Sequence, residues 1–317
     1  MTETGEAFSP LDWALLAAVA LMWGASFLFI AVGLEAFPPT LITLLRLGFG
    51  AATLAVFPRA RRAVPRSDWS AIALLGFFWM AAPLLLFPIA QQWIDSSLAG
   101  MLNGAVPLFA AAVAALLIRR LPAWRQSMGL LVGFLGVVGV SWPAVQGARS
   151  STVGAALVIL ATVFYGIALN LSVPLQRRNG ALPVLFRAQL TAIVMVAPFG
   201  LASVPSASFA WPSLAAIAAL GSFGTALAFV GMTTLVARVG ATRGSIAVYF
   251  VPVVAIVLGV LFRSETVALA SLIGTGLVLL GAYLTSRRER PRVRPVPAAS
   301  NGSGLPAGRV SQPSGIG

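Results

Sequence analysis

The chain has 317 residues, of which 59% are hydrophobic and only 9% are charged. Because a soluble domain carries about 25% charged residues, most of this surface must face something other than water. The chain contains no cysteine and no histidine, which excludes disulfides, thiolate metal sites, cysteine nucleophiles and every mechanism based on histidine. We therefore predict an all-α integral membrane protein, and we expect no metal or other cofactor.

Ten apolar segments come close to the length of about 20 residues that a helix needs to cross a bilayer. They cover residues 12–33, 39–57, 69–88, 96–118, 125–142, 152–174, 182–203, 211–236, 241–262 and 265–286. The first has a clear start signal, since Ser9 is followed by Pro10 and by Asp12 in the spacing of a capping box. The sequence predicts ten transmembrane helices, with a short N-terminus over 1–11 and a basic, disordered tail over 287–317.

The positive charge follows the predicted topology. The net charge is +13, and all the basic residues are arginine. If the segments alternate across the bilayer, two loop arginines fall on one side, Arg149 and Arg263, and seventeen on the other. The larger group is Arg59, Arg61, Arg62, Arg66, Arg119, Arg120, Arg125, Arg177, Arg178, Arg238, Arg243, Arg287, Arg288, Arg290, Arg292, Arg294 and Arg309. Because the arginine-rich side faces the cytoplasm, we predict a cytoplasmic-membrane protein with both termini inside, and no nucleic-acid partner.

The two halves of the chain can be laid on each other at a nearly constant offset. Trp23-Gly24 matches Tyr165-Gly166, and Gly76, Pro107, Gly129 and Gly136 match Gly221, Pro252, Gly274 and Gly281. Each half holds five segments, an odd number, so the second half enters the bilayer from the opposite side. We expect two inverted five-helix repeats, over 12–146 and 147–286, with a solute site between them near the middle of the membrane.

Several short motifs follow one another in a fixed order. They are Trp23-Gly24-x-Ser26-Phe27, Arg46, Ala90…Ser96-Ser97…Pro107, Tyr249-Phe250-Val251-Pro252 and Glu265. In this order the chain resembles the drug/metabolite transporter superfamily, in its ten-helix EamA-type branch, over about residues 12–286. The resemblance implies a transporter without enzymatic activity. It also implies a central cavity lined by helices 1–4 and 6–9, with helices 5 and 10 as scaffold.

Arg46 is the sharpest candidate for contact with a solute. It lies near the middle of the second predicted segment, where a charge costs about 2.5–3.5 kcal/mol on insertion scales. It either faces a cavity and orients an anionic or polar group of the solute, or ties its helix to polar groups of other helices. Both interpretations stay open. Gln189 has a similar place in the seventh segment and is a further pocket candidate.

The first helix of each half carries aromatic and polar residues next to a glycine, Gly24 or Gly166, that we predict to allow close approach of a neighbouring helix. Trp23 and Ser26 lie in the first segment, and Tyr165 and Asn170 in the sixth. Rings with a few polar groups suit a cavity for amphipathic metabolites. The alternative is that these residues pack at helix interfaces.

Two matched prolines predict breaks in helices. Pro107 and Pro252 each remove a backbone hydrogen bond inside a predicted helix, so each could act as a hinge or gate. Asn103 and Tyr249 lie within a turn of these prolines and are predicted to contact the solute. The alternative is a static kink that only shapes the packing.

Two carboxylates lie at predicted helix starts. Asp95 could take up a proton if export is coupled to protons, but Asp95 or Ser96 also fits a cap for the following helix. Glu265 lies at the start of the tenth segment, and we expect its carboxylate to meet the positive end of that helix.

The leading hypothesis is an exporter of small metabolites, amino-acid-like compounds or drugs that works by alternating access. A sugar-phosphate or nucleotide-sugar antiporter would require paired cations in the second half, a passive channel would require a continuous polar stripe, and a membrane-embedded transferase would require an acidic or histidine centre. The expected partners are a small solute and the lipid bilayer. The glycines of the fifth and tenth segments predict close contacts within a half or between subunits, which leaves a homodimer open.

Overall fold

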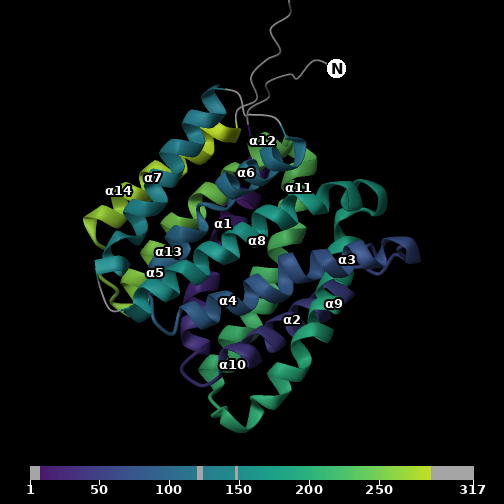
Figure 1. The fold of residues 1–317 in the computed structure, drawn as a ribbon. Helices are drawn as coiled ribbons and strands as arrows, with labels where there is room; N and C mark the ends of the chain where they lie inside the picture. The colour runs from purple at the N-terminus through teal and green to yellow at the C-terminus, as the bar shows by residue number, and fades with distance from the viewer. Residues whose placement is uncertain (1–7, 120–123, 147–148, 287–317) are drawn as a thin grey trace, which may run out of the picture. The chain divides into compact units, whose positions relative to one another are not determined.

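The computed structural model describes residues 8–119, 124–146 and 149–286, and every regular element in these ranges is helical (Figure 1). The predicted tail over 287–317 and most of the predicted N-terminus lie outside the described residues.

The helices of the first half are α1 (Pro10–Gly33), α2 (Pro39–Ala55), η1 (Arg66–Asp68), α3 (Trp69–Gly76), η2 (Phe77–Ala81), α4 (Ala82–Ala90), α5 (Ser96–Asn103), α6 (Val106–Ile118) and α7 (Trp124–Gln146). Those of the second half are α8 (Arg149–Asn179), α9 (Ala181–Ala202), η3 (Val204–Ser206), α10 (Trp211–Ala219), η4 (Leu220–Leu227), α11 (Ala228–Val239), α12 (Ala241–Gly244), α13 (Ile246–Arg263) and α14 (Leu269–Ser286). All ten predicted segments are occupied by helix. Eight helical stretches in the described ranges are long and apolar enough to cross a membrane, whereas α2 and the Leu269–Leu284 part of α14 are apolar but shorter.

The predicted start of the first helix is confirmed. The Ser9 hydroxyl oxygen accepts from the Asp12 N–H at 3.3 Å, and an Asp12 carboxylate oxygen accepts from the Ser9 N–H at 3.0 Å. The other Asp12 oxygen accepts from Nε of Arg238, in α11, at 2.6 Å. The cap of α1 therefore also joins the first half of the chain to the second.

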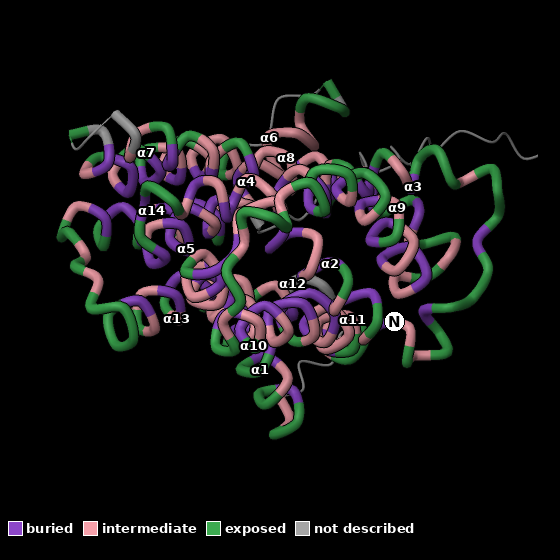
Figure 2. The backbone as a smooth tube through the Cα atoms, turned by 90° about the horizontal axis from the view of Figure 1, so that it is seen from below, coloured by how far each residue is buried: buried purple, intermediate pink, exposed green. Residues whose placement is uncertain are grey.

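Contacts between the two halves come in matched pairs. Helix α1 packs on α13 as α8 packs on α6, and α2 packs on η4 as α9 packs on η2. Three further contacts, α2 with α9, α5 with α13 and α7 with α14, join equivalent helices of the two halves. A two-fold relation between the halves produces this pattern. In Figure 2, exposed residues lie mainly on the outer sides of the helices and in the connecting turns.

Glycines on the first helix of each half allow the closest approaches. A Cβ atom on Gly24 would lie 2.5 Å from the Val254 side chain, and one on Gly166 would lie 2.8 Å from the backbone of Phe109. Any larger residue would push α1 from α13, or α8 from α6. The prediction that these glycines permit close packing is confirmed.

The glycine faces of α7 and α14 pack against each other within the chain (Figure 1). A Cβ atom on Gly274 would lie 2.7 Å from the Gly136 carbonyl oxygen, and one on Gly281 would lie 2.5 Å from the Gly133 nitrogen. The sequence placed this contact within a half or between subunits, and it lies instead between the two halves. The homodimer that the sequence left open is not tested by this contact.

The two matched prolines have different local structures. Helix α5 ends at Asn103, and α6 begins at Val106 with Pro107 in its first turn. Pro252 lies inside α13, and the helix continues on both sides of it. The Pro252 ring packs closely on Gly104, where an added Cβ atom would lie 2.9 Å from the ring. Among the described residues, the helix is therefore interrupted next to its proline only in the first half. In the second half the interruption comes earlier, between α12 and α13.

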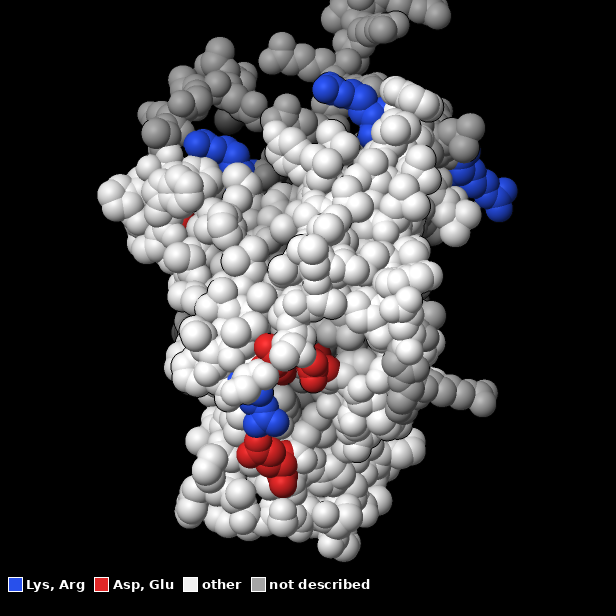
Figure 3. All heavy atoms as spheres, turned by 90° about the vertical axis from the view of Figure 1, so that its left-hand side faces the viewer, with Lys and Arg blue, Asp and Glu red and all other residues white. Residues whose placement is uncertain are grey.

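The third helix of each half contains a π-helical segment, η2 in the first and η4 in the second. A π-helical turn adds a residue to the helical turn and changes which side chains share a face. The sequence analysis did not predict these segments. On the face shown in Figure 3, charged side chains form a few small groups separated by wide uncharged surface, as a lipid-facing surface requires.

Candidate functional site

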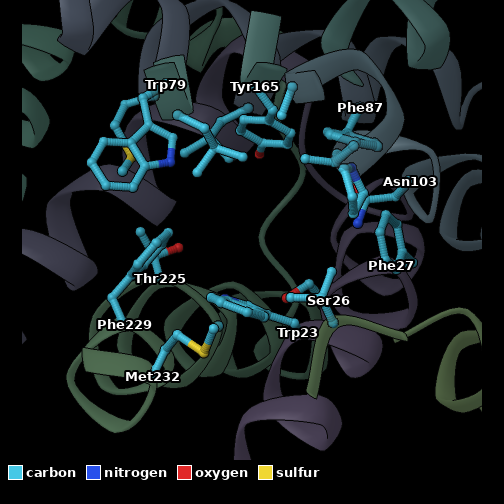
Figure 4. Close-up of a pocket in the computed structure, with 18 of the residues that line it drawn as sticks. Trp23, Ser26, Phe27, Trp79, Phe87, Asn103, Tyr165, Thr225, Phe229 and Met232 are labelled. Carbon is cyan, nitrogen blue, oxygen red and sulfur yellow. The ribbon is translucent and has the colours of Figure 1, made fainter. Parts of the chain in front are cut away.

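A cavity of about 440 Å³ lies between the two halves and is bounded by side chains from both (Figure 4). Its lining residues in the first half are Trp23, Ser26, Phe27, Ile30, Arg46, Trp79, Met80, Leu84, Phe87, Asn103, Val106, Pro107 and Ala110. Those in the second half are Tyr165, Leu169, Gly224, Thr225, Phe229, Met232, Ser245, Val248 and Tyr249. The volume falls within the range of about 300–1,000 Å³ of small-molecule sites.

Most of the predicted pocket residues meet at this cavity. The ones that line it are Trp23, Ser26, Arg46, Asn103, Tyr165 and Tyr249, together with the predicted hinge residue Pro107. Asn170, Gln189, Pro252 and Asp95 are not among the lining residues. The two halves thus supply equivalent aromatic residues, Trp23 and Tyr165, to one space. What these residues bind remains a prediction.

Arg46 is the only charged side chain among the described residues that line the cavity. It is 6% exposed, and its Nε donates to the Thr225 hydroxyl oxygen at 2.9 Å. Thr225 belongs to η4, so this bond joins α2 of the first half to the second half. The structure therefore combines both interpretations of Arg46, because one nitrogen makes a contact between helices while the side chain lines the cavity.

The other polar lining residues differ in how far the protein satisfies them. The Ser26 hydroxyl donates to the Met22 carbonyl oxygen at 3.0 Å, and the Tyr249 hydroxyl donates to the Ala282 carbonyl oxygen at 3.1 Å. The amide of Asn103 makes no hydrogen bond with the described residues. Asn103 is therefore better placed than Ser26 to form a hydrogen bond with a solute.

Aromatic residues form much of the wall, and several were missed in the sequence. Trp79 and Phe229 stack edge to face with ring centroids 5.2 Å apart, and Phe87 lies 6.0 Å from Tyr165. In Figure 4, Trp79, Tyr165 and Phe87 lie across the cavity from Trp23. The available signals were the aromatic run in the third segment and Thr225 among apolar residues of the eighth. The π-helical segments changed their helical register, so helical periodicity did not select them.

Asn170 and Gln189 lie outside the cavity lining, and both make hydrogen bonds to neighbouring helices. The Asn170 amide donates to the carbonyl oxygens of Ala110 and Gly166, at 3.0 and 2.9 Å, and so fixes α8 against α6. Gln189 is fully buried between α9 and α2, where its amide nitrogen donates to the Leu47 carbonyl oxygen at 2.9 Å. Both side chains are used in helix packing because the rotation of their helices turns them away from the cavity.

Glu265 caps a different helix from the one expected. Its carboxylate accepts from the Ser96 N–H at 2.9 Å, the Ser96 hydroxyl at 2.6 Å and the Ser97 N–H at 2.8 Å. These groups form the start of α5 in the other half, whereas α14 begins only at Leu269. Burial raises the pKa of Glu265, but the hydrogen bonds from Ser96 and Ser97 outweigh burial, so its pKa lies below the ordinary value.

Asp95 occupies the N-cap position of α5, but its side chain makes no capping hydrogen bond. Glu265 fulfils that role instead. Burial, and then the nearby charge of Glu265, raise the pKa of Asp95 above its ordinary value. The predicted proton uptake at Asp95 is untested, and Asp95 lies outside the cavity lining.

Comparison with known proteins agrees with this architecture. The EamA-like transporter family matches the chain twice, over residues 12–142 and 152–287. The chain belongs to the EamA-like transporter family. The two matches correspond to the two repeats of the chain. Together with the apolar helices that are long enough to span a membrane, the family identifies the chain as a multi-pass membrane transporter.

Relatives of this EamA-like chain are also transporters by name. A protein of Archaeoglobus fulgidus, described as an uncharacterized transporter, is 25% identical over 87% of this chain and 99% of its own length. A protein of Streptantibioticus cattleyicolor, described as a probable terminal-alkyne amino-acid exporter, is 29% identical over 89% of this chain and 95% of its own. One solved crystal structure has the same fold, with a TM-score of 0.61 and 20% identity over 86% of this chain and 95% of that one. These likenesses point to transport and away from catalysis.

Proposed function

We propose that this transporter exports small metabolites, amino-acid-like compounds or drugs across the cytoplasmic membrane by alternating access. The observation that carries the proposal is the cavity shared by the two repeats, with Trp23 and Asn103 from one and Tyr165 and Tyr249 from the other. If the repeats rock against each other, such a cavity opens to one side of the membrane at a time. The described name of the S. cattleyicolor relative supports export of an amino-acid-like solute.

The proposal includes ten spans in two inverted repeats, with both termini in the cytoplasm. The 17 residues of α2 are at the lower end of the range of about 17–25 that can span a bilayer. A short span is accommodated by local thinning of the bilayer at modest cost. The arginine distribution supports the orientation.

The absence of cysteine from the sequence allows a direct test of this topology. Single cysteines replace Ser206, between the seventh and eighth predicted spans, and Arg61, between the second and third. We expect an impermeant maleimide to label Ser206→Cys in intact cells and Arg61→Cys only after the membrane is opened. The reverse pattern would invert the orientation, and labelling of both from outside would refute the span count.

Polar contacts join the two repeats near both ends of α1. Near its start, Asp12 pairs with Arg238 at 2.6 Å, and after its end Glu35 pairs with Arg263. Alternating access requires the contacts at one end to separate while those at the other stay closed. The positions of these pairs suit that cycle.

Purified protein in proteoliposomes tests the function. We expect saturable uptake of a labelled solute from a panel of amphipathic metabolites, and faster uptake when the same unlabelled solute is inside. Trp23→Ala and Arg46→Ala should reduce transport, whereas Trp142→Ala, which removes an exposed tryptophan of α7, should not. Normal transport by both cavity variants would refute the site.

The same assay separates the alternatives. A passive channel would give uptake that does not saturate and that internal solute does not accelerate. A sugar-phosphate or nucleotide-sugar antiporter would transport phosphorylated solutes, for which the one charged lining residue, Arg46, offers a single cation where two are needed. Strict dependence on internal phosphate would favour that antiporter over the proposed exporter.

A further inference from the structure

The cavity presents hydrogen-bond donors that have no acceptor among the residues that the structure describes. Beyond Nε, the guanidinium of Arg46 makes no hydrogen bond with the described residues. The same holds for the indole N–H groups of Trp23 and Trp79. Guanidinium and indole groups can only donate. These donors favour a ligand that supplies acceptor oxygens. The Asn103 amide, which also makes no hydrogen bond with the described residues, can both donate and accept.

The charge of the cavity lining is positive, and among the described residues none of the lining groups is negative. Arg46 is 6% exposed, and no carboxylate is found among the described lining residues. A buried cation without a counter-charge is costly, and a partner that brings the opposite charge offsets this cost. An anionic group of a bound solute would supply that partner.

Thr225 holds Arg46 in a fixed orientation. Its hydroxyl accepts from Nε at 2.9 Å and donates to the Leu220 carbonyl oxygen at 3.3 Å. Leu220 and Thr225 both belong to the π-helical segment η4. With Nε fixed in this way, the two terminal nitrogens of the guanidinium are left for the solute. A planar guanidinium can bind the two oxygens of one carboxylate through parallel hydrogen bonds.

We propose that the cavity binds solutes with one carboxylate on an apolar or aromatic body, and that the carboxylate binds the terminal nitrogens of Arg46. This inference rests on the proposed transport function. A single cation matches a single negative charge, and the aromatic wall formed by Trp23, Trp79, Phe87 and Phe229 matches the apolar body. Thr225 is a positioning residue for Arg46.

A matched pair of probes tests the carboxylate directly. We compare 3-phenylpropionate with 3-phenylpropanamide, a neutral molecule of nearly the same size, by calorimetric titration of the purified wild-type protein. Hydrogen bonds to charged groups contribute about 1.5–3 kcal/mol, so we expect the acid to bind about ten- to a hundredfold more tightly. Equal affinity, tighter binding of the amide, or no measurable binding of the acid would overturn the inference.

Variants assign the preference to Arg46. Arg46→Gln should reduce the acid-to-amide ratio to about one, and Thr225→Val should reduce it in part. The control is Arg187→Gln in α9, because Arg187 does not line the cavity. The Arg187 guanidinium donates instead to the carbonyl oxygens of Ala60 and Arg61. Arg187→Gln should keep the wild-type ratio. An acid-to-amide ratio that is unchanged in Arg46→Gln would refute the assignment of the carboxylate to Arg46. If that variant does not fold, the wild-type comparison alone still tests whether the cavity prefers carboxylates.

The two proposals fail in different ways. Saturable transport of amines or neutral solutes in proteoliposomes, without preference for acids, would leave the transport function standing and refute the carboxylate site. Tight, Arg46-dependent binding of the acid without transport of any probe would refute the function and leave the site.

Discussion

A single added methyl group should distinguish two glycines that lie two positions apart in α14. Gly274 is buried against α7, and a Cβ atom there would lie 2.5 Å from the Val140 nitrogen and 2.7 Å from the Gly136 carbonyl oxygen. A Cβ atom on Gly276 would have nothing within 4 Å. Gly274→Ala and Gly276→Ala therefore change the same helix by the same atoms and differ only in what those atoms meet.

The magnitude follows from these distances. Ordinary contact begins near 3.4 Å, so α7 and α14 must separate by about 0.9 Å, the difference between 3.4 and 2.5 Å. Overpacking costs about 1–3 kcal/mol, and the opposing atoms are backbone that cannot rotate away. Alanine is more favourable than glycine inside a helix by up to about 1 kcal/mol, which offsets part of this cost. We expect Gly274→Ala to lower the free energy of unfolding by about 1–2 kcal/mol, and Gly276→Ala to leave it unchanged or raise it by up to about 1 kcal/mol.

The assay is the thermal midpoint of the purified protein in one detergent, followed by intrinsic fluorescence and by loss of the monodisperse peak in size exclusion. The expected order is Gly276→Ala at or above wild type and Gly274→Ala below it. Equal midpoints for the two variants would refute the contact between α7 and α14 as described.

Three further predictions concern contacts between the repeats. Gly50→Ala should destabilise the protein by about 1–2 kcal/mol because its Cβ would meet the Gln189 side chain of α9 and the Gly221 carbonyl oxygen of η4. Gly48→Ala, whose Cβ would have nothing within 4 Å, should leave the stability unchanged. Similar melting midpoints for the two variants would contradict this. Glu265→Gln should cost about 1–2 kcal/mol through loss of the charged cap. Because the folded pKa of Glu265 lies below its ordinary value of 4.5, this stabilisation is present above that value and lost as the pH falls through the folded pKa; melting at several pH values should show the wild-type advantage only at the higher ones. Asp12→Asn should lower the thermal midpoint by weakening the cap and the pair with Arg238, and the difference from wild type should shrink in high salt.

Local chemistry was sufficient for several features of this protein. The capping box at Ser9 and Asp12 involves residues three positions apart, so its formation does not depend on distant parts of the fold. The matched glycines of the two halves predicted close helix contacts because any side chain at Gly24 or Gly166 would exclude the neighbouring helix. The resemblance to the EamA-type branch was confirmed by the family match over residues 12–142 and 152–287.

Other features depended on partners far along the chain. Asn103 and Asn170 are both polar residues in apolar segments, yet one lines the cavity and the other binds the Ala110 carbonyl oxygen. The difference comes from how each helix is rotated against its neighbours. Glu265 lies close to the start of its own helix but caps α5, which is 169 residues away in the chain. No sequence pattern identifies a partner at that distance.

The sequence by itself determined the membrane class, the helical segments, the two repeats and the family, because apolar length, helix caps and glycine spacing are properties of short stretches of chain. Only the tertiary structure decided which polar side chains share the cavity. Arg46 lines it and Gln189 does not, although both lie deep in matching segments. The physical reason is that helix rotation, and the π-helical turns that alter it at η2 and η4, are set by packing between the repeats.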